Sequence, residues 1–192
     1  QNAAWIWPSA EFTRNQRANF FFEAEIDAIP ATAEVCIGCE TRYWLFVNGE
    51  LAVFEGGLFR ESAPGCGYYD IVDLAPYLKE GKNEIAIHVW YYGNGGRNNS
   101  FCGKPGLILA CDTLGLYSSA DTLCYVDTAY YTPTTEPTSY LYGGEHTAYN
   151  AAVKPFSLCP AKENAHGAAV LGRYGDTPWG ELEKRQIGRA SC

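Results

Sequence analysis

The feature that most constrains the fold is an Asn-Gly pair, Asn48-Gly49, between two apolar runs. The odd-numbered positions from 35 to 47 are largely apolar, and Leu51 and Val53 follow the pair. An Asn-Gly pair in this setting is the strongest short-range signal of a β-hairpin, because both central residues of a type I′ turn need positive φ. The chain is therefore predicted to centre on an antiparallel β-hairpin.

Apolar and polar residues also alternate in segments on both sides of this hairpin. In residues 84–90 the odd positions Ile85, Ile87 and Val89 share one face, and the even positions share the other. Further elements are predicted as strands at residues 20–26, 106–111, 123–131 and 168–171, and as a short amphipathic turn at 73–78. No long amphipathic helix is expected, so the predicted fold is an all-β, antiparallel β-sandwich.

At 192 residues the chain is long enough to bury a full core, and we predict one β-sandwich domain over residues 1–187. Its core strands are expected within residues 5–131. An irregular, loop-rich C-terminal part follows, with a closing segment at 168–187. Residues 188–192 are expected to form a tail.

Charge and hydropathy exclude two classes of partner. The formal net charge is −8 at pH 7, whereas nucleic-acid binding needs a basic surface. The same charge disfavours an anionic membrane surface, and no apolar run approaches the roughly 18 residues that span a bilayer. No nucleic-acid partner and no membrane partner are therefore expected.

Eight cysteines occur, of which Cys36 and Cys39 have the spacing of a metal-binding pair. On a strand, however, positions i and i+3 point to opposite faces, so the two thiols are not expected to share one zinc ion. The spacing of the other cysteines is irregular, and a free cysteine packs as a small apolar residue. The cysteines are therefore predicted to be core residues rather than a disulfide scaffold or a metal site.

No catalytic motif stands out in the sequence. Glycoside hydrolysis needs two carboxylates about 5–10 Å apart. The 22 acidic residues of this chain make some such pair inevitable, so the pair carries no information. A cysteine nucleophile would need a histidine and an orienting partner, and none of His88, His146 and His166 lies in a recognisable motif.

Sugar binding fits the residues better, because carbohydrate sites combine aromatic faces with amide, carboxylate and guanidinium groups. The strand end at Trp90 leads into a polar loop that supplies both kinds of group, and a shallow groove lined by Trp90, Tyr92 and Arg97 is predicted. The candidate carbohydrate-binding residues are His88, Trp90, Tyr92, Asn94, Arg97, Asn98, Asn99 and Arg60. The alternative is that the aromatic residues pack in a core or an inter-domain contact, and that residues 93–99 only form turns.

Several motifs together resemble a known family. They are Trp5-Ile6-Trp7, AEVCIGCETRYWLFVNGE at 33–50, YYDIVDLAPYLKEGKNEIAIHVWYYG at 68–93, and Gly175-Asp176-Thr177-Pro178-Trp179-Gly180. This pattern is similar to the N-terminal β-sandwich domain of bacterial α-L-rhamnosidases. The resemblance implies a jelly-roll sandwich of the galactose-binding-like type, with the general acid and base in a separate (α/α) barrel C-terminal to it.

The resemblance thus implies a non-catalytic accessory module whose partner is the C-terminal catalytic domain of the same protein. A calcium ion is implied by analogy with similar modules, with Glu61 and Asp70 as candidate ligands, and no other cofactor is expected. A secreted or periplasmic location is also implied, with the cytoplasm as the alternative. Three functions stay open: a scaffold with an apolar, groove-free patch near Trp179, a module that binds L-rhamnose or a related sugar, and an independent glycosidase.

Overall fold

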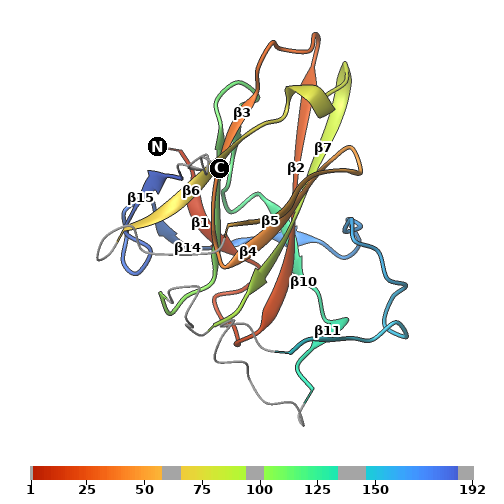
Figure 1. Cartoon of the computed structure of the whole chain (residues 1–192), viewed down its shortest axis with the longest axis vertical. Helices are drawn as coiled ribbons and strands as arrows, with labels where there is room; N and C mark the ends of the chain where they lie inside the picture. The colour runs from red at the N-terminus through yellow and green to blue at the C-terminus, as the bar shows by residue number, and fades with distance from the viewer. Residues whose placement is uncertain (1, 58–65, 94–101, 134–145, 186–192) are drawn as a thin grey trace, which may run out of the picture.

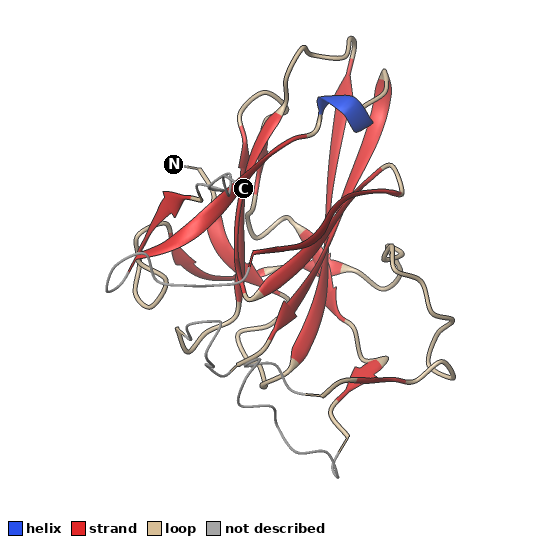
Figure 2. Cartoon of the chain, viewed as in Figure 1, coloured by secondary structure: helices blue, strands red, loops and turns tan. Residues whose placement is uncertain are grey.

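The computed structural model describes residues 2–57, 66–93, 102–133 and 146–185, and their strands form two sheets that face each other (Figure 1). In these residues one short 3₁₀-helix, η1 (Ala75–Tyr77), occupies the predicted amphipathic turn (Figure 2). No helix in the described ranges is long and apolar enough to cross a membrane. The all-β sandwich expected from the sequence is confirmed. The predicted tail at 188–192 lies outside the described residues.

The first sheet contains seven of the described strands. Its path runs through β14 (Ala169–Arg173), β1 (Ala4–Trp7), β8 (Gly106–Cys111), β3 (Glu34–Glu40), β6 (Cys66–Asp73) and β15 (Glu181–Lys184), and β9 (Leu116–Tyr117) pairs with β8. The second sheet contains six, in the order β13 (His166–Gly167), β10 (Leu123–Val126), β2 (Gln16–Ile26), β7 (Gly81–Tyr91), β4 (Arg42–Val47) and β5 (Glu50–Gly57). A separate pair joins β11 (Tyr130–Tyr131) to β12 (Ala148–Tyr149).

The predicted hairpin at Asn48-Gly49 joins β4 to β5. The φ angles of Asn48 and Gly49 are 52° and 81°, so both central residues have the positive φ of a type I′ turn. Val47 and Glu50 pair directly on either side of them. The sequence signal is therefore confirmed at the level of backbone conformation.

The main core fills the space between the two sheets. On β7, Ile85, Ile87 and Val89 point into it, as their alternation predicted, and all three are buried. The neighbouring strand β2 contributes Phe20 and Phe22 to the same core. Both sheets therefore bury an apolar face against each other, which stabilises the sandwich.

Each sheet also carries a smaller apolar cluster on its outer face. On the first sheet Trp5 stacks on Trp179, with ring centroids 4.9 Å apart and an angle of 10° between the planes, and Leu182 packs beside them. On the second sheet the cluster consists of Phe21, Trp44, Phe46 and Ala86. Different C-terminal segments contribute to the two clusters, and these segments lie on opposite sides of the molecule in Figure 1.

Two departures from the predicted strands have local causes. The strand predicted at 123–131 is interrupted after β10, because the Asp127 carboxylate accepts a hydrogen bond from the Ala129 N–H (3.2 Å) and the chain turns before β11. The sequence does not predict β15, since Leu182 is the one buried residue of its four and no alternation marks the strand. β15 pairs with β6 in parallel, so the first sheet is mixed rather than wholly antiparallel.

Candidate functional site

The predicted sugar-binding residues of β7 lie on the outer face of the second sheet, around Arg17 of β2. The guanidinium carbon of Arg17 lies 4.0 Å from the ring centroid of Trp90 and 4.3 Å from that of Tyr130. Trp44 and His88 complete this group, which we call the arginine cluster. Arg17 is thus held between two aromatic rings, an arrangement that cation–π attraction stabilises.

Hydrogen bonds define the protonation state of His88. Nη1 of Arg17 lies 3.2 Å from Nε2 of His88, and Nδ1 of His88 lies 2.7 Å from Oδ1 of Asn19. An arginine only donates, so Nε2 accepts, and Nδ1 carries the proton that His88 donates to Asn19. Burial, together with the charges of Arg17 and Lys154, lowers the pKa of His88 well below 6.5, so the ring is neutral at pH 7. Burial also lowers the pKa of Arg17 to about 10, and the guanidinium keeps its charge at neutral pH.

The C-terminal half of the chain covers the arginine cluster. Lys154 donates to Oδ2 of Asp127 (2.5 Å), the residue that follows β10. Nε1 of Trp90 donates to Oδ1 of Asn15 (2.7 Å), and the Asn15 amide donates in turn to the carbonyl oxygen of His146 (3.2 Å). These bonds tie the second sheet to the segment that begins at His146, so the aromatic rings of the cluster are packed by protein.

The structure places three of the predicted sugar-binding residues. His88 and Tyr92 are buried, with 5% and 3% of their surface exposed, and Trp90 is half-buried. The Trp90 ring contacts the Arg17 guanidinium and lies 4.5 Å from the Tyr92 ring between centroids. Like the calcium candidate Glu61, the other sugar-binding candidates lie outside the described residues: Arg60, Asn94, Arg97, Asn98 and Asn99. A carbohydrate site at these residues stays a prediction.

Asp70, the described candidate ligand for calcium, is bonded on both carboxylate oxygens. Oδ2 accepts from the Tyr43 hydroxyl (3.0 Å) and from the Gly57 N–H (2.9 Å), and Oδ1 accepts from Nε of Arg185 (2.6 Å). A calcium ion at this carboxylate would have to displace the arginine, and a calcium site at Asp70 stays a prediction. No group of three or more histidine, cysteine, aspartate or glutamate residues arranged to hold a metal ion occurs within the described ranges.

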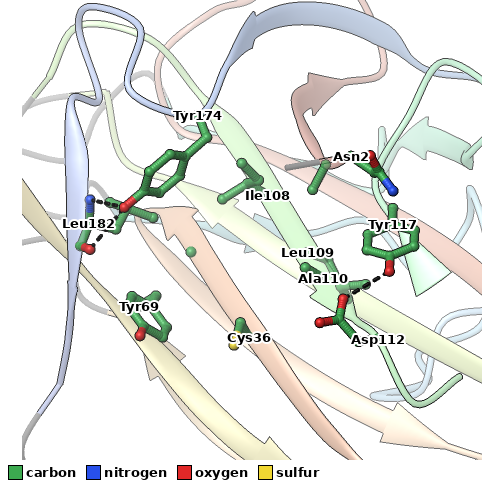
Figure 3. A pocket seen from close by; sticks show the side chains of 12 residues that line it. Asn2, Cys36, Tyr69, Ile108, Leu109, Ala110, Asp112, Tyr117, Tyr174 and Leu182 are labelled. Carbon is green, nitrogen blue, oxygen red and sulfur yellow. Dashed lines mark hydrogen bonds between the residues drawn. The ribbon is translucent and has the colours of Figure 1, made fainter. Parts of the chain in front are cut away.

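An open groove of about 350 Å³ lies on the outer face of the first sheet (Figure 3). We call it the tyrosine groove, because Tyr69 of β6, Tyr117 of β9 and Tyr174, which precedes β15, surround it. The other lining residues are Asn2, Ala3, Cys36, Gly38, Ile108, Leu109, Ala110, Asp112 and Leu182. Residues from the beginning, the middle and the end of the described chain therefore meet at this groove.

Small residues on two central strands produce the groove. The outward positions of β3 include Cys36 and Gly38, and Ala110 of β8 pairs with Cys36. A Cβ atom at Gly38 would lie 2.7 Å from Cδ1 of Leu182, so a larger residue would displace that wall. Cys36 lines the groove whereas Cys39 packs in the main core, which confirms that the two thiols point to opposite faces.

Polar groups lie at the two ends of the tyrosine groove. The Tyr174 hydroxyl donates to the carbonyl oxygen of Leu182 (3.1 Å) and accepts from the Leu182 N–H (3.2 Å), which fixes the ring as a wall. At the other end the Tyr117 hydroxyl donates to Oδ1 of Asp112 (2.8 Å), and the Asn2 side chain lies above them in Figure 3. The groove thus combines aromatic walls with a carboxylate, an amide and hydroxyl groups.

Sequence reasoning missed the tyrosine groove. Cys36 and Gly38 alternate with buried core residues, so a floor of small residues was visible in the strand pattern. The three tyrosines come from distant segments, and only the fold brings them together. The scaffold hypothesis expected a groove-free apolar patch near Trp179. In the structure Trp179 is fully buried, and the groove lies beside its neighbour Leu182.

Two facing sheets with apolar clusters on both outer faces define this chain as an all-β sandwich domain. A GH78-family rhamnosidase of Bacillus sp. GL1 contains a region that matches 96% of this chain, with a TM-score of 0.79 and 26% sequence identity. An α-L-rhamnosidase from Dictyoglumus thermophilum also matches 96% of it, with a TM-score of 0.62 and 16% identity. A lectin of Pleurotus ostreatus matches 93% of it, with a TM-score of 0.53 and 17% identity. The chain is therefore similar to a domain of α-L-rhamnosidases, as its motifs predicted.

The chain spans only part of each of these proteins. It covers 20% of the Bacillus rhamnosidase, 22% of the Dictyoglumus enzyme and 44% of the lectin. The likenesses to the Dictyoglumus enzyme and to the lectin, at 16% and 17% identity, show the fold alone. No family model matches the sequence, and no curated protein matches it significantly.

Proposed function

We propose that this chain is an accessory, non-catalytic module of a larger α-L-rhamnosidase-like glycoside hydrolase, N-terminal to the catalytic barrel. The observation that carries the proposal is the match to the Bacillus sp. GL1 rhamnosidase, which covers 96% of this chain but 20% of that one. A sandwich of this size leaves most of such a protein to hold the catalytic groups.

The titratable groups of the described residues suit a supporting role. Glu40 is fully buried and shielded from solvent, and burial raises the pKa of its carboxyl well above the usual range. His88 is buried, neutral and bonded to Arg17 and Asn19, and Asp70 is bonded to three donors. Each of these groups serves the fold, whereas a general acid or base has to reach the substrate.

β15, the last strand of the described residues, anchors the end of such a module to the sandwich. β15 pairs with β6, and the bond from Nε of Arg185 to Asp70 holds the end of β15 against the sandwich. Trp179, just before β15, stacks on Trp5 of β1. We infer that this anchoring sets the direction in which the chain leaves the sandwich towards the catalytic barrel, and that the module supports the barrel in this way.

The test is hydrolysis of a chromogenic aryl α-L-rhamnoside by the purified chain, beside the full-length protein that contains it. We expect turnover from the full-length protein and none above background from the chain alone. A mock purification from the same host cells supplies the background. Turnover that co-elutes with the chain through successive chromatographic steps would establish an independent glycosidase and overturn the proposal.

A second function, carbohydrate binding by the same module, is favoured by the tyrosine groove. Its walls are aromatic, and its polar groups include the Asp112 carboxylate and the Asn2 amide, which is the chemistry of sugar sites. The lectin likeness supports a shared fold and does not assign a ligand. The apolar residues at the floor of the groove indicate which class of sugar it suits.

A further inference from the structure

We propose that the tyrosine groove binds the pyranose ring of a 6-deoxyhexose, with L-rhamnose as the representative sugar. This inference rests on the proposed function, because an α-L-rhamnosidase-like context narrows the sugars that the module meets. The groove itself supplies the physical reasons, which are its size, its aromatic walls, its polar end and its apolar floor.

The size and the walls of the groove suit one sugar ring. Its volume of about 350 Å³ lies at the lower end of the range for small-molecule sites, roughly 300–1,000 Å³. Tyr174 is held by two hydrogen bonds to Leu182, and Tyr69 lies at the same end of the groove (Figure 3). Aromatic rings that are already held in place stack on the C–H face of a pyranose at little cost in conformational entropy.

The opposite end of the groove offers partners for sugar hydroxyls. Tyr117 bonds to Oδ1 of Asp112, and among the described residues no group bonds to Oδ2 of that carboxylate. A carboxylate oxygen accepts from hydroxyls, and the side-chain amide of Asn2, at the same end, both donates and accepts. Burial raises the pKa of Tyr69, so its neutral hydroxyl adds a donor at the aromatic end.

The floor between the two ends is apolar and disfavours the hydroxyl on C6 of a hexose. Gly38, Ile108 and Ala110 form this floor, and Leu182 closes one side. A methyl group placed here leaves water favourably, whereas a hydroxyl placed here loses water without gaining a partner. L-Rhamnose and L-mannose differ only by the hydroxyl on C6, so L-rhamnose is the better ligand for this floor. An apolar side chain of a neighbouring domain is the competing occupant.

The test is calorimetric titration of the chain with L-rhamnose and, separately, with L-mannose. We expect saturable binding of L-rhamnose, and binding of L-mannose that is about tenfold to a hundredfold weaker, the loss that one unpaired hydroxyl causes. In two-dimensional amide NMR spectra, the Gly38 signal should shift as L-rhamnose is added, because Gly38 lies in the floor.

Two variants locate the site, and a third is the matched control. Ala110→Trp fills the groove from β8 and Tyr69→Ala removes one wall, so each should reduce the affinity for L-rhamnose at least about tenfold. Tyr131→Ala removes a ring that is 51% exposed on β11, outside the groove, and should leave the affinity unchanged. Thermal unfolding checks that each variant folds, and Asp112→Ala at the exposed rim replaces any groove variant that does not.

Several outcomes would overturn the assignment. Binding that survives Ala110→Trp would place the site elsewhere, and equal affinity for the two sugars would show that the floor does not select a methyl group. No binding of either sugar would overturn the assignment. These results leave the accessory role untouched, because the turnover assay with the full-length protein and the chain alone decides it separately.

Discussion

The two outer faces of this sandwich carry similar aromatic residues but present different surfaces. On the second sheet, Arg17 fills the space between Trp90 and Tyr130, at 4.0 and 4.3 Å from their ring centroids. On the first sheet, Tyr69 and Tyr174 stand at the edge of an open groove of about 350 Å³. The aromatic rings around Arg17 are therefore packed by protein, whereas those around the groove border an open surface.

The cause of this contrast lies on the central strands of each sheet. On β4 and β7 the outward residues include the large Trp44 and Trp90, and the segment that begins at His146 covers them. On β3 and β8 the outward residues include Gly38 and Ala110. Among the described strands, the covering strand β15 pairs only with β6, at the edge of the sheet. Side-chain size at the centre of a sheet and the reach of its covering segment thus decide which face is left with an open groove.

The largest loss of stability is expected from Trp179→Ala, which would disrupt the face of the first sheet that carries the tyrosine groove (the open face). Trp179 is fully buried against Trp5, so the variant should lose about 3–5 kcal/mol of unfolding free energy in urea denaturation. Binding of L-rhamnose should fall as well, because Leu182 packs in the same cluster and lines the groove. Tyr131→Ala, an exposed ring, should stay within about 0.5 kcal/mol of the parent. An equally small effect of Trp179→Ala would show that the stack does not anchor β15.

A somewhat smaller loss of stability is expected from Trp90→Ala, which would uncover the arginine cluster on the second sheet (the closed face). The half-buried Trp90 covers Arg17 and donates to Asn15, so the variant should lose about 2–4 kcal/mol in the same assay. L-Rhamnose binding at the tyrosine groove should not change. Loss of sugar binding with unchanged stability would instead support the site predicted at Trp90 and Arg97, and would reverse the contrast between the two faces.

The hairpin and the core strands were predictable because their signals are local. Asn48-Gly49 specified the turn, and the alternation in residues 84–90 specified which side of β7 faces the core. The same alternation placed His88 and Trp90 together on the opposite side, which the structure confirms. No local pattern showed that Arg17, 71 residues before His88, lies against these rings.

The tyrosine groove was not predictable, because its walls meet only through long-range packing. Tyr69 and Tyr174 lie far apart in the chain, and Tyr174 reaches the groove through its bonds to Leu182 on β15. β15 has the sequence ELEK with one buried residue, which carries no strand signal of its own. The motif around Trp179 was part of the resemblance to α-L-rhamnosidases, yet it gave no sign that Trp179 stacks on Trp5 near the other end of the chain.

The closed face also predicts how stability depends on pH. Because burial lowers the pKa of His88 well below 6.5, the unfolded chain binds a proton below pH 6.5 that the folded chain resists. This contribution to stability is complete above pH 6.5 and is lost as the pH falls from there towards the folded pKa, by about 1.4 kcal/mol per pH unit.

Urea denaturation of the parent and of His88→Asn between about pH 7 and about pH 5 measures this loss. The variant lacks the buried imidazole, so its stability should fall less steeply over this range. The exposed His146 and His166 remain in both proteins and cancel in the difference. Parallel pH profiles would show that His88 accepts a proton in the folded chain, which a closed and desolvated face does not allow.

The smallest loss of stability is expected from Tyr174→Phe, at the rim of the open face. The variant keeps the ring but loses both hydrogen bonds to Leu182, so its unfolding free energy should fall by about 1 kcal/mol. Its affinity for L-rhamnose should change less than about threefold, whereas Tyr174→Ala, which removes the ring, should reduce the affinity about tenfold. Equal losses in the two variants would show that the hydroxyl, by holding β15, shapes the groove more than the ring does. The open face would then depend on β15 as fully as the closed face depends on the segment that begins at His146. The two faces would differ only in how far these segments reach across their sheets.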